Sequence, residues 1–336
     1  MKIGIFDSGY GGLSVLHSAF CKIDAEFIYY ADEKHVPYGE KSRDEILHFV
    51  REIVEFLREK GVDAIIIACN SASSVFNYFE RAKIALPIIA MEPAVKLAVD
   101  RYGANLASFK NISTSNLADN SQDLATNLPI NSAQIYESIL VCATQITING
   151  EKLRLLMESL NIKADLLALG GLVKIAENAK FSGNFSANEY LKQFQTQIKR
   201  AKILVLAQDL EFDSPAVRAY LQGELGKFEL ARLGSLVLGC THFNYFKSEF
   251  LKINGDLIFV DGNLGTLKQL LRMVDSASNS EQISRDNEDE LRDFREFDFD
   301  KLMACCEFYE SGKILSVKQT QRLKIYFDRL DIEQKI

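Results

Sequence analysis

The sequence predicts an α/β fold in which helices cover both faces of parallel sheets. Strand and helix patterns alternate through the first hundred residues, which is typical of βαβ units. A chain of 336 residues, 47% of them hydrophobic, is long enough for two domains with sizeable cores. Two distant segments, AIIIACNS (64–71) and SLVLGCTH (235–242), each carry an apolar strand into a cysteine and then into small polar residues. Open α/β sheets bind their ligands at such strand ends.

The first hundred residues contain four predicted strands and one well-defined helix. Short apolar runs predict the strands at 2–6, 26–30, 63–68 and 87–90. The helix runs from about Ser42 to Lys60, because Ser42 and Glu45 form a capping box and Gly61 ends the pattern. Its apolar stripe has helical spacing and consists of Ile46, Val50, Ile53, Val54 and Leu57.

The rest of the chain resumes this alternation after an interruption. Residues 101–136 are rich in Asn, Ser and Thr and predict an inserted surface excursion. A helix is expected near 149–160, the acidic stretch 275–299 is expected to be a solvated loop or linker, and 303–309 reads as a closing strand. Further strands are predicted at 139–143, 165–168, 203–206, 235–238 and 257–260.

Composition narrows the classes of function. The net charge of −7 and the lack of basic clusters argue against nucleic acid or an anionic membrane as the main partner. The apolar runs are strand-sized and no signal-peptide pattern precedes the first strand, so we expect a cytoplasmic protein with no membrane span. Six cysteines in such a chain are expected to be reduced, and with four histidines they form no ligand spacing typical of zinc.

Cys69 and Cys240 stand apart from the other cysteines because hydrogen-bonding residues follow each of them at once. Each is predicted to lie near a helix N-terminus, which favours the thiolate. A thiol has a reference pKa of about 8.5, so both protonation states are accessible near neutral pH. Two such groups can remove the α-proton of an amino acid from one face and return a proton to the other, without pyridoxal or a metal. Cys21, Cys142, Cys305 and Cys306 are expected to be small core residues.

Two loops add candidate ligand contacts, each with a plainer alternative. FDSGYGGL (6–13) has three glycines that let the backbone approach a small carboxylate, but it also fits a tight βα turn with Asp7 capping the helix. PYG (37–39) presents the Tyr38 hydroxyl in a turn, and taken alone it predicts a half-buried tyrosine.

Taken together, these segments resemble the glutamate racemases of the cofactor-independent aspartate/glutamate racemase superfamily. Seven segments recur in family order through most of the chain, and this shared order makes the resemblance specific. They are FDSGYGGL (6–13), PYG (37–39), ACNSAS (68–73), MEPAVKLAV (91–99), AT-x-x-T (143–147), LGCTHF (238–243) and a looser EFYESG (307–312).

The resemblance implies a role for each matching residue. Cys69 and Cys240 correspond to the two catalytic bases, with Asp7 assisting the first and His242 and Glu177 the second. No cofactor or metal is implied. The implied substrate contacts, for the carboxylates and ammonium of glutamate, are Asp7, Ser8, Pro37, Tyr38, Gly39, Asn70, Ser71, Thr144, Thr147, Thr241 and His242.

The chain departs from the family pattern mainly around its second cysteine. Phe243-Asn244 stands where the family usually has Tyr-Pro, and Gly170-Gly171 stands where Cys-Pro precedes the assisting glutamate, which bears on the assignment of Glu177. Ser71 replaces the usual threonine and keeps the hydroxyl. The cysteines also lie further apart than usual, and the excess falls in two expected inserts, at about 101–136 and 179–232.

The resemblance also implies an architecture and a setting. Two similar parallel-sheet α/β domains are expected, with the active site in the cleft between them: residues 1–98 plus 262–336, and residues 99–261. A homodimer that supplies D-glutamate for peptidoglycan synthesis is expected. Two alternatives are a racemase of another acidic amino acid such as aspartate and a non-catalytic racemase-like binding protein. The retention of both cysteines with Asp7 and His242 argues against the second.

Overall fold

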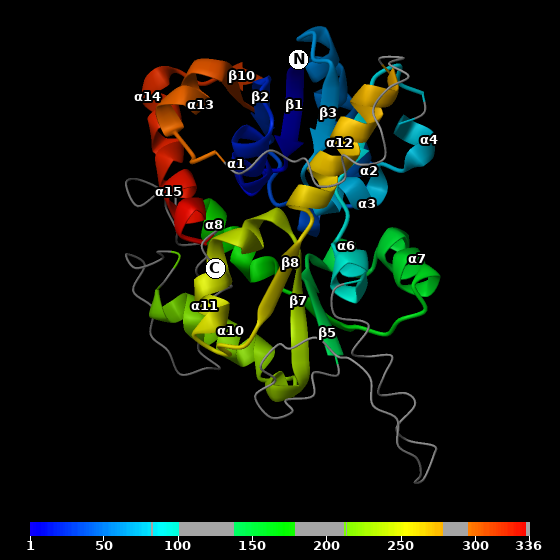
Figure 1. Cartoon of the computed structure of the whole chain (residues 1–336), viewed down its shortest axis with the longest axis vertical. Coiled ribbons are helices and arrows are strands. Elements are labelled where there is room, and N and C mark those ends of the chain that lie inside the picture. The colour runs from blue at the N-terminus through cyan, green and yellow to red at the C-terminus, as the bar shows by residue number, and fades with distance from the viewer. Residues whose placement is uncertain (82, 101–137, 179–211, 213, 278–294, 334–336) are drawn as a thin grey trace, which may run out of the picture.

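Two parallel sheets organise the molecule (Figure 1). The computed structural model describes residues 1–81, 83–100, 138–178, 212, 214–277 and 295–333. The first sheet has six strands in the order β10-β9-β2-β1-β3-β4, and only the β9–β10 pair is antiparallel. The second sheet has four parallel strands in the order β6-β5-β7-β8. The α/β fold predicted from the alternating pattern is confirmed.

The first sheet draws its strands from both ends of the chain. They are β1 (Lys2–Asp7), β2 (Glu26–Ala31), β3 (Ala64–Ile67), β4 (Ile88–Ala90), β9 (Cys306–Glu310) and β10 (Lys313–Ile314). The helices between the first four are α1 (Leu13–Lys22), a 3-10 turn (Tyr38–Glu40), α2 (Arg43–Glu59), α3 (Asn70–Val75) and α4 (Tyr78–Arg81). The predicted capping box of α2 is present, with the Glu45 amide donating to Ser42 Oγ at 3.3 Å.

The second sheet contains β5 (Ser138–Ala143), β6 (Asp165–Ala168), β7 (Leu233–Gly239) and β8 (Ile258–Asp261). Its helices are α6 (Gln145–Ile148), α7 (Glu151–Ser159), α8 (Gly170–Asn178), α10 (Pro215–Leu225) and α11 (Lys247–Leu251), with 3-10 turns at Leu230–Arg232 and Thr241–Phe246. From there α12 (Asn263–Ala277) runs back beside β3 and β4 of the first sheet (Figure 1). Among the residues described, none of the helices has the length and apolar character that crossing a bilayer requires.

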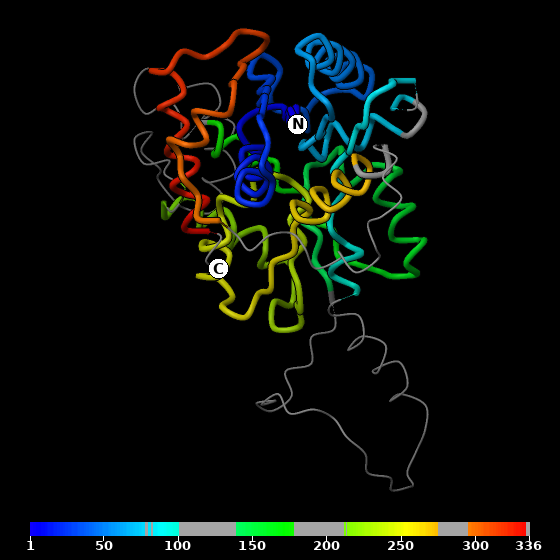
Figure 2. The backbone as a smooth tube through the Cα atoms, turned by 45° about the horizontal axis from the view of Figure 1, so that its top comes forward, coloured from blue at the N-terminus to red at the C-terminus, as the bar shows by residue number. Residues whose placement is uncertain are grey.

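The C-terminal segment returns to the first sheet. After α13 (Phe299–Cys305), β9 pairs with β2 in a register that sets Cys306 opposite Phe27. The chain closes with α14 (Val317–Thr320), a 3-10 turn (Gln321–Leu323) and α15 (Lys324–Glu333), drawn in orange and red beside the N-terminal strands in Figure 2. A first domain made of both chain ends requires this pairing, but the boundaries 1–98, 99–261 and 262–336 stay predictions.

Three sequence predictions need correction. Residues 303–305 are not the start of a strand but the end of α13, whose N-terminus is capped by Asp298 accepting from the Lys301 amide at 3.1 Å. Tyr38 is fully buried rather than half-buried. Residues 275–277 of the predicted acidic loop form the end of α12, while 278–294 lie outside the described residues.

Two further predictions fall outside the described part of the chain. They are the insert at 101–136 and, within the expected insert at 179–232, the strand at 203–206. The described part of that second insert carries α10, which starts at Ser214 and packs Val217 and Leu221 into the core.

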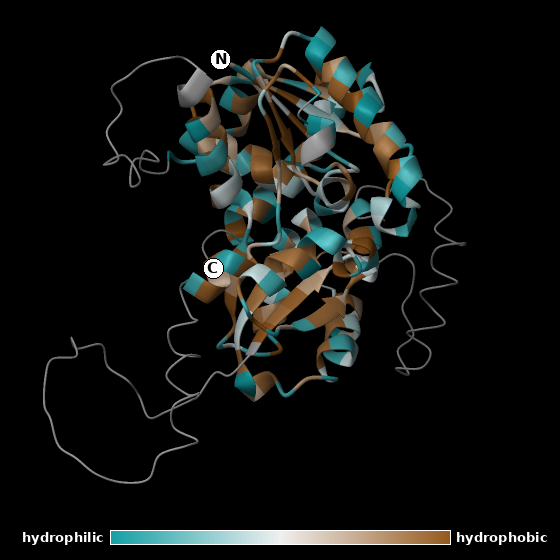
Figure 3. Cartoon of the chain, turned by 90° about the vertical axis from the view of Figure 1, so that its right-hand side faces the viewer, coloured by the Kyte–Doolittle hydropathy of each residue, from teal (hydrophilic) through white to brown (hydrophobic). Residues whose placement is uncertain are grey.

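Apolar side chains fill the space on both sides of each sheet. One large cluster joins the two sheets, since it includes Ile5 of β1, Cys142 of β5 and Leu236 of β7. A second lies under α2, and a third lies under α7. Figure 3 shows the brown apolar strands enclosed by helices whose outer faces are teal. This shared core holds the ends of both sheets in contact, and the candidate site lies there.

Candidate active site

Both singled-out cysteines lie at the carboxyl end of a central strand. Cys69 follows β3 and caps α3, and Cys240 follows β7 and caps the 3-10 turn Thr241–Phe246. Both side chains are buried, with 5% and 6% of their surface exposed. The predicted position of each cysteine, between a strand and a short helix, is therefore confirmed.

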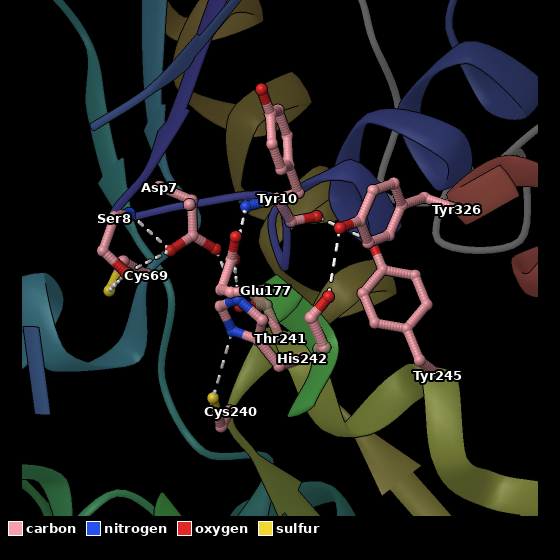
Figure 4. A network of polar contacts seen from close by, with 12 residues as sticks. Asp7, Ser8, Tyr10, Cys69, Glu177, Cys240, Thr241, His242, Tyr245 and Tyr326 are labelled. Atoms are coloured by element: carbon pink, nitrogen blue, oxygen red, sulfur yellow. Dashed lines mark hydrogen bonds and ion pairs between the residues drawn. The ribbon is translucent and has the colours of Figure 1, made fainter. Parts of the chain in front are cut away.

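On the Cys69 side, the nearest acid is Asp7 at the end of β1. The Ser8 amide donates to Asp7 Oδ1 at 2.6 Å, and Cys69 Sγ lies 3.7 Å from Ser8 Oγ, as Figure 4 shows. Cys69 also forms a side-chain hydrogen bond with Asp7. Burial raises the pKa of Asp7 above its ordinary value of 3.8, against the charge of His242 and the hydrogen bonds to the carboxylate.

The protonation state of Cys69 differs from the prediction. A helix N-terminus was expected to favour the thiolate, but burial and the neighbouring charge of Asp7 raise the pKa of Cys69 well above its ordinary value of 9.0. The backbone hydrogen bond from Ala72 in the six-residue helix α3 lowers the pKa of Cys69 by less than burial raises it. The surroundings of Cys69 in this structure therefore favour the thiol over the thiolate.

On the Cys240 side, three groups form a row. Cys240 Sγ lies 3.7 Å from Nδ1 of His242, and Nε2 of the same ring lies 2.5 Å from Oε1 of Glu177 (Figure 4). Burial alone would lower the pKa of His242, but its hydrogen bonds and charge interactions with Cys240 and Glu177 raise it well above 6.5. The imidazole can therefore carry a proton between the sulfur and the carboxylate.

Thr241 connects the two sides. Its hydroxyl donates to Asp7 Oδ2 at 2.7 Å, so the residue after Cys240 bonds to the acid beside Cys69. Asp7 lies at the carboxyl end of β1 in one sheet and Thr241 follows β7 in the other. The two thiols are thus brought to one place from strand ends of different sheets.

A chain of hydroxyl groups lies nearby. Ser71 Oγ lies 2.9 Å from Thr144 Oγ1, which lies 3.0 Å from Thr147 Oγ1. Gly39 packs directly against Thr144, where a Cβ atom would approach the threonine side chain to 2.9 Å. These residues come from the 3-10 turn after Pro37, from α3 and from the start of α6. Such a row of hydroxyl groups can donate hydrogen bonds to a carboxylate.

Asn70 and Tyr38 complete the predicted set. Asn70 is buried, and its Oδ1 atom has no hydrogen-bond partner among the described residues, which leaves an acceptor for an ammonium group. The Tyr38 hydroxyl donates instead to Asp32 Oδ2 at 2.6 Å. Pro37 precedes the turn that carries Tyr38, and no contact joins it to either sulfur among the interactions described.

Sequence reasoning missed the residues of the first loop that contact the side chains of Glu177 and His242. The Tyr10 amide donates to Glu177 Oε1 at 2.8 Å, and a Cβ atom on Gly9 would overlap that carboxylate. A Cβ on Gly11 would overlap the ring of His242. The glycines of the first loop therefore admit the side chains of Glu177 and His242. The spacing in SGYGG was the available signal, but sequence reasoning considered only a carboxylate ligand or a tight βα turn for it.

The sequence of this chain is similar to those of several glutamate racemases. No protein-family model matches it. The glutamate racemases of Campylobacter concisus and Campylobacter curvus are each 42% identical to it, over 81% of this chain and 82% of their own length. One from Halothermothrix orenii is 33% identical over 98% of this chain and 99% of its own.

Solved structures share the fold. Glutamate racemase from Campylobacter jejuni aligns with a TM-score of 0.56 at 24% identity, over 97% of this chain and 98% of its own. The Escherichia coli enzyme, crystallised with L-glutamate and an activator, UDP-MurNAc-Ala, aligns with a TM-score of 0.57 at 23% identity, over 82% of each chain. At this identity the alignments establish the architecture alone.

Proposed function

This chain belongs to the glutamate racemase family, and from that premise we propose that Cys69 and Cys240 carry the two proton transfers by which it interconverts L- and D-glutamate. The observation that carries the proposal is the pairing of each buried thiol with its own assisting groups. Cys69 has Asp7 and Ser8, while Cys240 has His242 and Glu177. The Thr241–Asp7 bond joins the two sets.

The reaction needs one thiolate and one thiol at a time. The thiolate takes the α-proton, so that an S–H bond forms as the C–H bond breaks and the electron pair remains on the α-carbon, delocalised into the α-carboxylate. The opposite thiol then gives its proton to the other face of that carbon and becomes the thiolate. The reverse reaction exchanges the two roles, so no cofactor is consumed.

The assisting groups make each thiolate accessible despite its burial. We assign Asp7 to accept and return the proton of Cys69, and the His242–Glu177 pair to do the same for Cys240. The pKa of the Asp7 carboxyl and that of the His242 imidazole are both raised, which makes each a better proton acceptor for the neighbouring thiol. Ser8 and Thr241 orient Asp7 by donating to its two oxygens.

Substrate recognition is assigned to the remaining matched residues. The hydroxyls of Ser71, Thr144 and Thr147 suit a carboxylate, and the unpartnered oxygen of buried Asn70 suits the ammonium. Tyr38 and Gly39 border this region, where Gly39 fixes the approach of Thr144. Thr144 and Asn70 are both buried, so a glutamate bound to them is expected to lose its water shell.

The same proposal includes the cellular location, the oligomeric state and the metabolic role of the enzyme. We assign the enzyme to the cytoplasm and expect it to be a homodimer. Its D-glutamate enters peptidoglycan synthesis. Its partner is glutamate itself and not nucleic acid. Light scattering after size exclusion tests the dimer. A panel containing aspartate tests the choice of substrate.

The experiment that tests the catalytic assignment follows the optical activity of L-glutamate by circular dichroism with purified, reduced protein. Cys69→Ala and Cys240→Ala are each expected to abolish the decay. Cys142→Ala is the matched control, because Cys142 is equally buried but lies inside β5. Loss of activity in Cys142→Ala alone, or no decay with folded wild-type protein, would refute the assignment.

A further inference from the structure

Three buried tyrosines donate hydrogen bonds to backbone carbonyls around the candidate site. Tyr29 donates to the carbonyl of Gly9 at 2.7 Å, Tyr245 to that of Tyr10 at 2.6 Å, and Tyr326 to that of Ala176 at 3.0 Å. Burial raises the pKa of all three phenols well above 10, so they remain protonated donors. The backbone at 9–10 and at 176 is therefore fixed by side chains distant in sequence.

Two of these bonds converge on Glu177. Ala176 is the residue before Glu177, and the Tyr10 amide donates directly to the Glu177 carboxylate. The ring of Tyr326 also packs against the rings of Tyr10 and Tyr245, with centroids 5.4 Å apart in each case (Figure 4). Tyr326 thus holds the backbone beside Glu177, and Tyr245 holds the backbone of Tyr10, the residue whose amide binds the carboxylate.

Helix α15, which carries Tyr326, also holds the segment that follows His242. Arg329 Nε donates to the carbonyl of Tyr245 at 2.9 Å. Glu333 accepts from the amide and hydroxyl of Ser248, both at 2.7 Å. The described hydrogen bonds of the Asp7 side chain come from Ser8, Thr241 and Cys69, and α15 supplies none of them. These hydrogen bonds of α15 therefore go to residues near the Cys240 side, and among the hydrogen bonds described none from α15 goes to Asp7, Ser8 or Cys69.

We propose that Tyr326 is a positioning residue for proton transfer at Cys240, acting from the C-terminal helix through the Ala176 carbonyl and hence through Glu177. The inference rests on the proposed roles of Cys240 and Glu177. Loss of the Tyr326 hydroxyl leaves the ring packing in place but frees the backbone beside Glu177. The His242–Glu177 contact then loses its fixed geometry, and transfer at Cys240 slows more than transfer at Cys69.

Turnover alone does not separate the two sides, because kcat/KM must be equal for two enantiomers whose equilibrium constant is unity. Primary isotope effects do separate them. When proton transfer at Cys240 slows, that step limits the rate more strongly. The isotope effect on kcat/KM then grows for the α-deuterated enantiomer that Cys240 deprotonates, and it shrinks for the enantiomer that Cys69 deprotonates. Glu177→Gln and Asp7→Asn provide the reference patterns for the Cys240 and Cys69 sides.

The experiment measures isotope effects on kcat/KM with α-deuterated L- and D-glutamate in Tyr326→Phe. We expect kcat to fall about threefold to tenfold, the effect of one lost hydrogen bond. The two isotope effects should shift in the same direction as in Glu177→Gln and in the opposite direction from those in Asp7→Asn. Tyr30→Phe is the matched control, since Tyr30 is buried in β2 against Phe56, without a described hydrogen bond from its hydroxyl. It should keep wild-type isotope effects.

Equal shifts for both enantiomers in Tyr326→Phe, or wild-type isotope effects, would overturn the proposal. If Tyr326→Phe does not fold, Tyr245→Phe carries the same expectation, because Tyr245 bonds to the carbonyl of Tyr10, whose amide binds Glu177. Unchanged isotope effects there count equally against the proposal. Absence of racemisation by the wild-type protein is a separate result, which refutes the proposed function on which this inference rests.

Discussion

Nε2 of His242 lies 2.5 Å from Oε1 of Glu177, although 65 residues separate them in the sequence. Glu177 closes a row that begins at Cys240 and passes through the imidazole. From sequence the assignment of Glu177 had little support, because the residues before it depart from the family pattern. The contact gives that carboxylate a defined partner.

Replacing the Glu177 carboxylate should slow the reaction without unfolding the protein. Glu177→Gln removes the charge that stabilises the imidazolium, and a charge-assisted hydrogen bond contributes about 1.5–3 kcal/mol. We expect kcat to fall about tenfold to a hundredfold. Glu158→Gln is the control, because Glu158 pairs only with exposed Arg154 on α7 among the interactions described. Unchanged kcat in Glu177→Gln would remove Glu177 from the mechanism.

A methyl group on Gly9 should reproduce this loss from the other side of the contact. The added Cβ would overlap the Glu177 carboxylate, so Gly9→Ala must displace it. Steady-state kinetics should show a fall in kcat comparable to that of Glu177→Gln. Gly223→Ala in α10 meets nothing within 4 Å and should keep full activity, with helix stability raised by up to about 1 kcal/mol. Full activity in Gly9→Ala would mean that the position of Glu177 does not matter.

The pH dependence of kcat/KM should move when Asp7 loses its charge. Burial raises the pKa of Cys69, and the negative charge of Asp7 raises it further, so the thiolate forms only on the alkaline side. In Asp7→Asn this second contribution disappears and the pKa of Cys69 falls. The acidic limb of kcat/KM, which reports the free enzyme, should shift to lower pH even though the maximal rate decreases. A shift to higher pH would contradict the assigned pairing.

The hydroxyl chain should affect binding more than chemistry. Thr144→Val keeps the shape of the side chain but removes the oxygen between Ser71 and Thr147. We expect KM for glutamate to rise about tenfold while kcat changes less, because one hydrogen bond to a charged carboxylate is lost. Thr266→Val is the control, since its hydroxyl donates to the carbonyl of Gly262, the residue before α12. A loss confined to kcat would place Thr144 outside substrate binding.

Local patterns predicted the sheets, and they predicted which side chains lie at the strand ends. The alternation of apolar runs and helical stripes located β1 to β4, and Ser42 with Glu45 located the start of α2, because both signals act over a few residues. The start of the predicted closing strand was wrong by three residues, because residues 303–305 belong to α13. There Asp298 caps the N-terminus of a helix, α13, which includes the first residues of the apolar run and ends at Cys305.

The contacts that position the acids were beyond reach from the sequence. The bonds from Tyr245 and Tyr326 to backbone carbonyls join segments more than a hundred residues apart, and no local pattern marks a tyrosine for such a role. The protonation of Cys69 was mispredicted for a similar reason. The helix-terminus argument is local, whereas burial is set by the packing of both sheets.

The two-thiol mechanism is tested most directly by starting from L-glutamate in D2O and examining both enantiomers at early conversion. If one thiol removes the α-proton and the other donates a solvent-derived deuteron, the D-glutamate formed carries deuterium at the α-carbon while the remaining L-glutamate keeps its hydrogen. Deuterium appearing equally in both enantiomers, or D-glutamate that retains the original hydrogen, would contradict the assignment of Cys69 and Cys240 to opposite faces of the substrate.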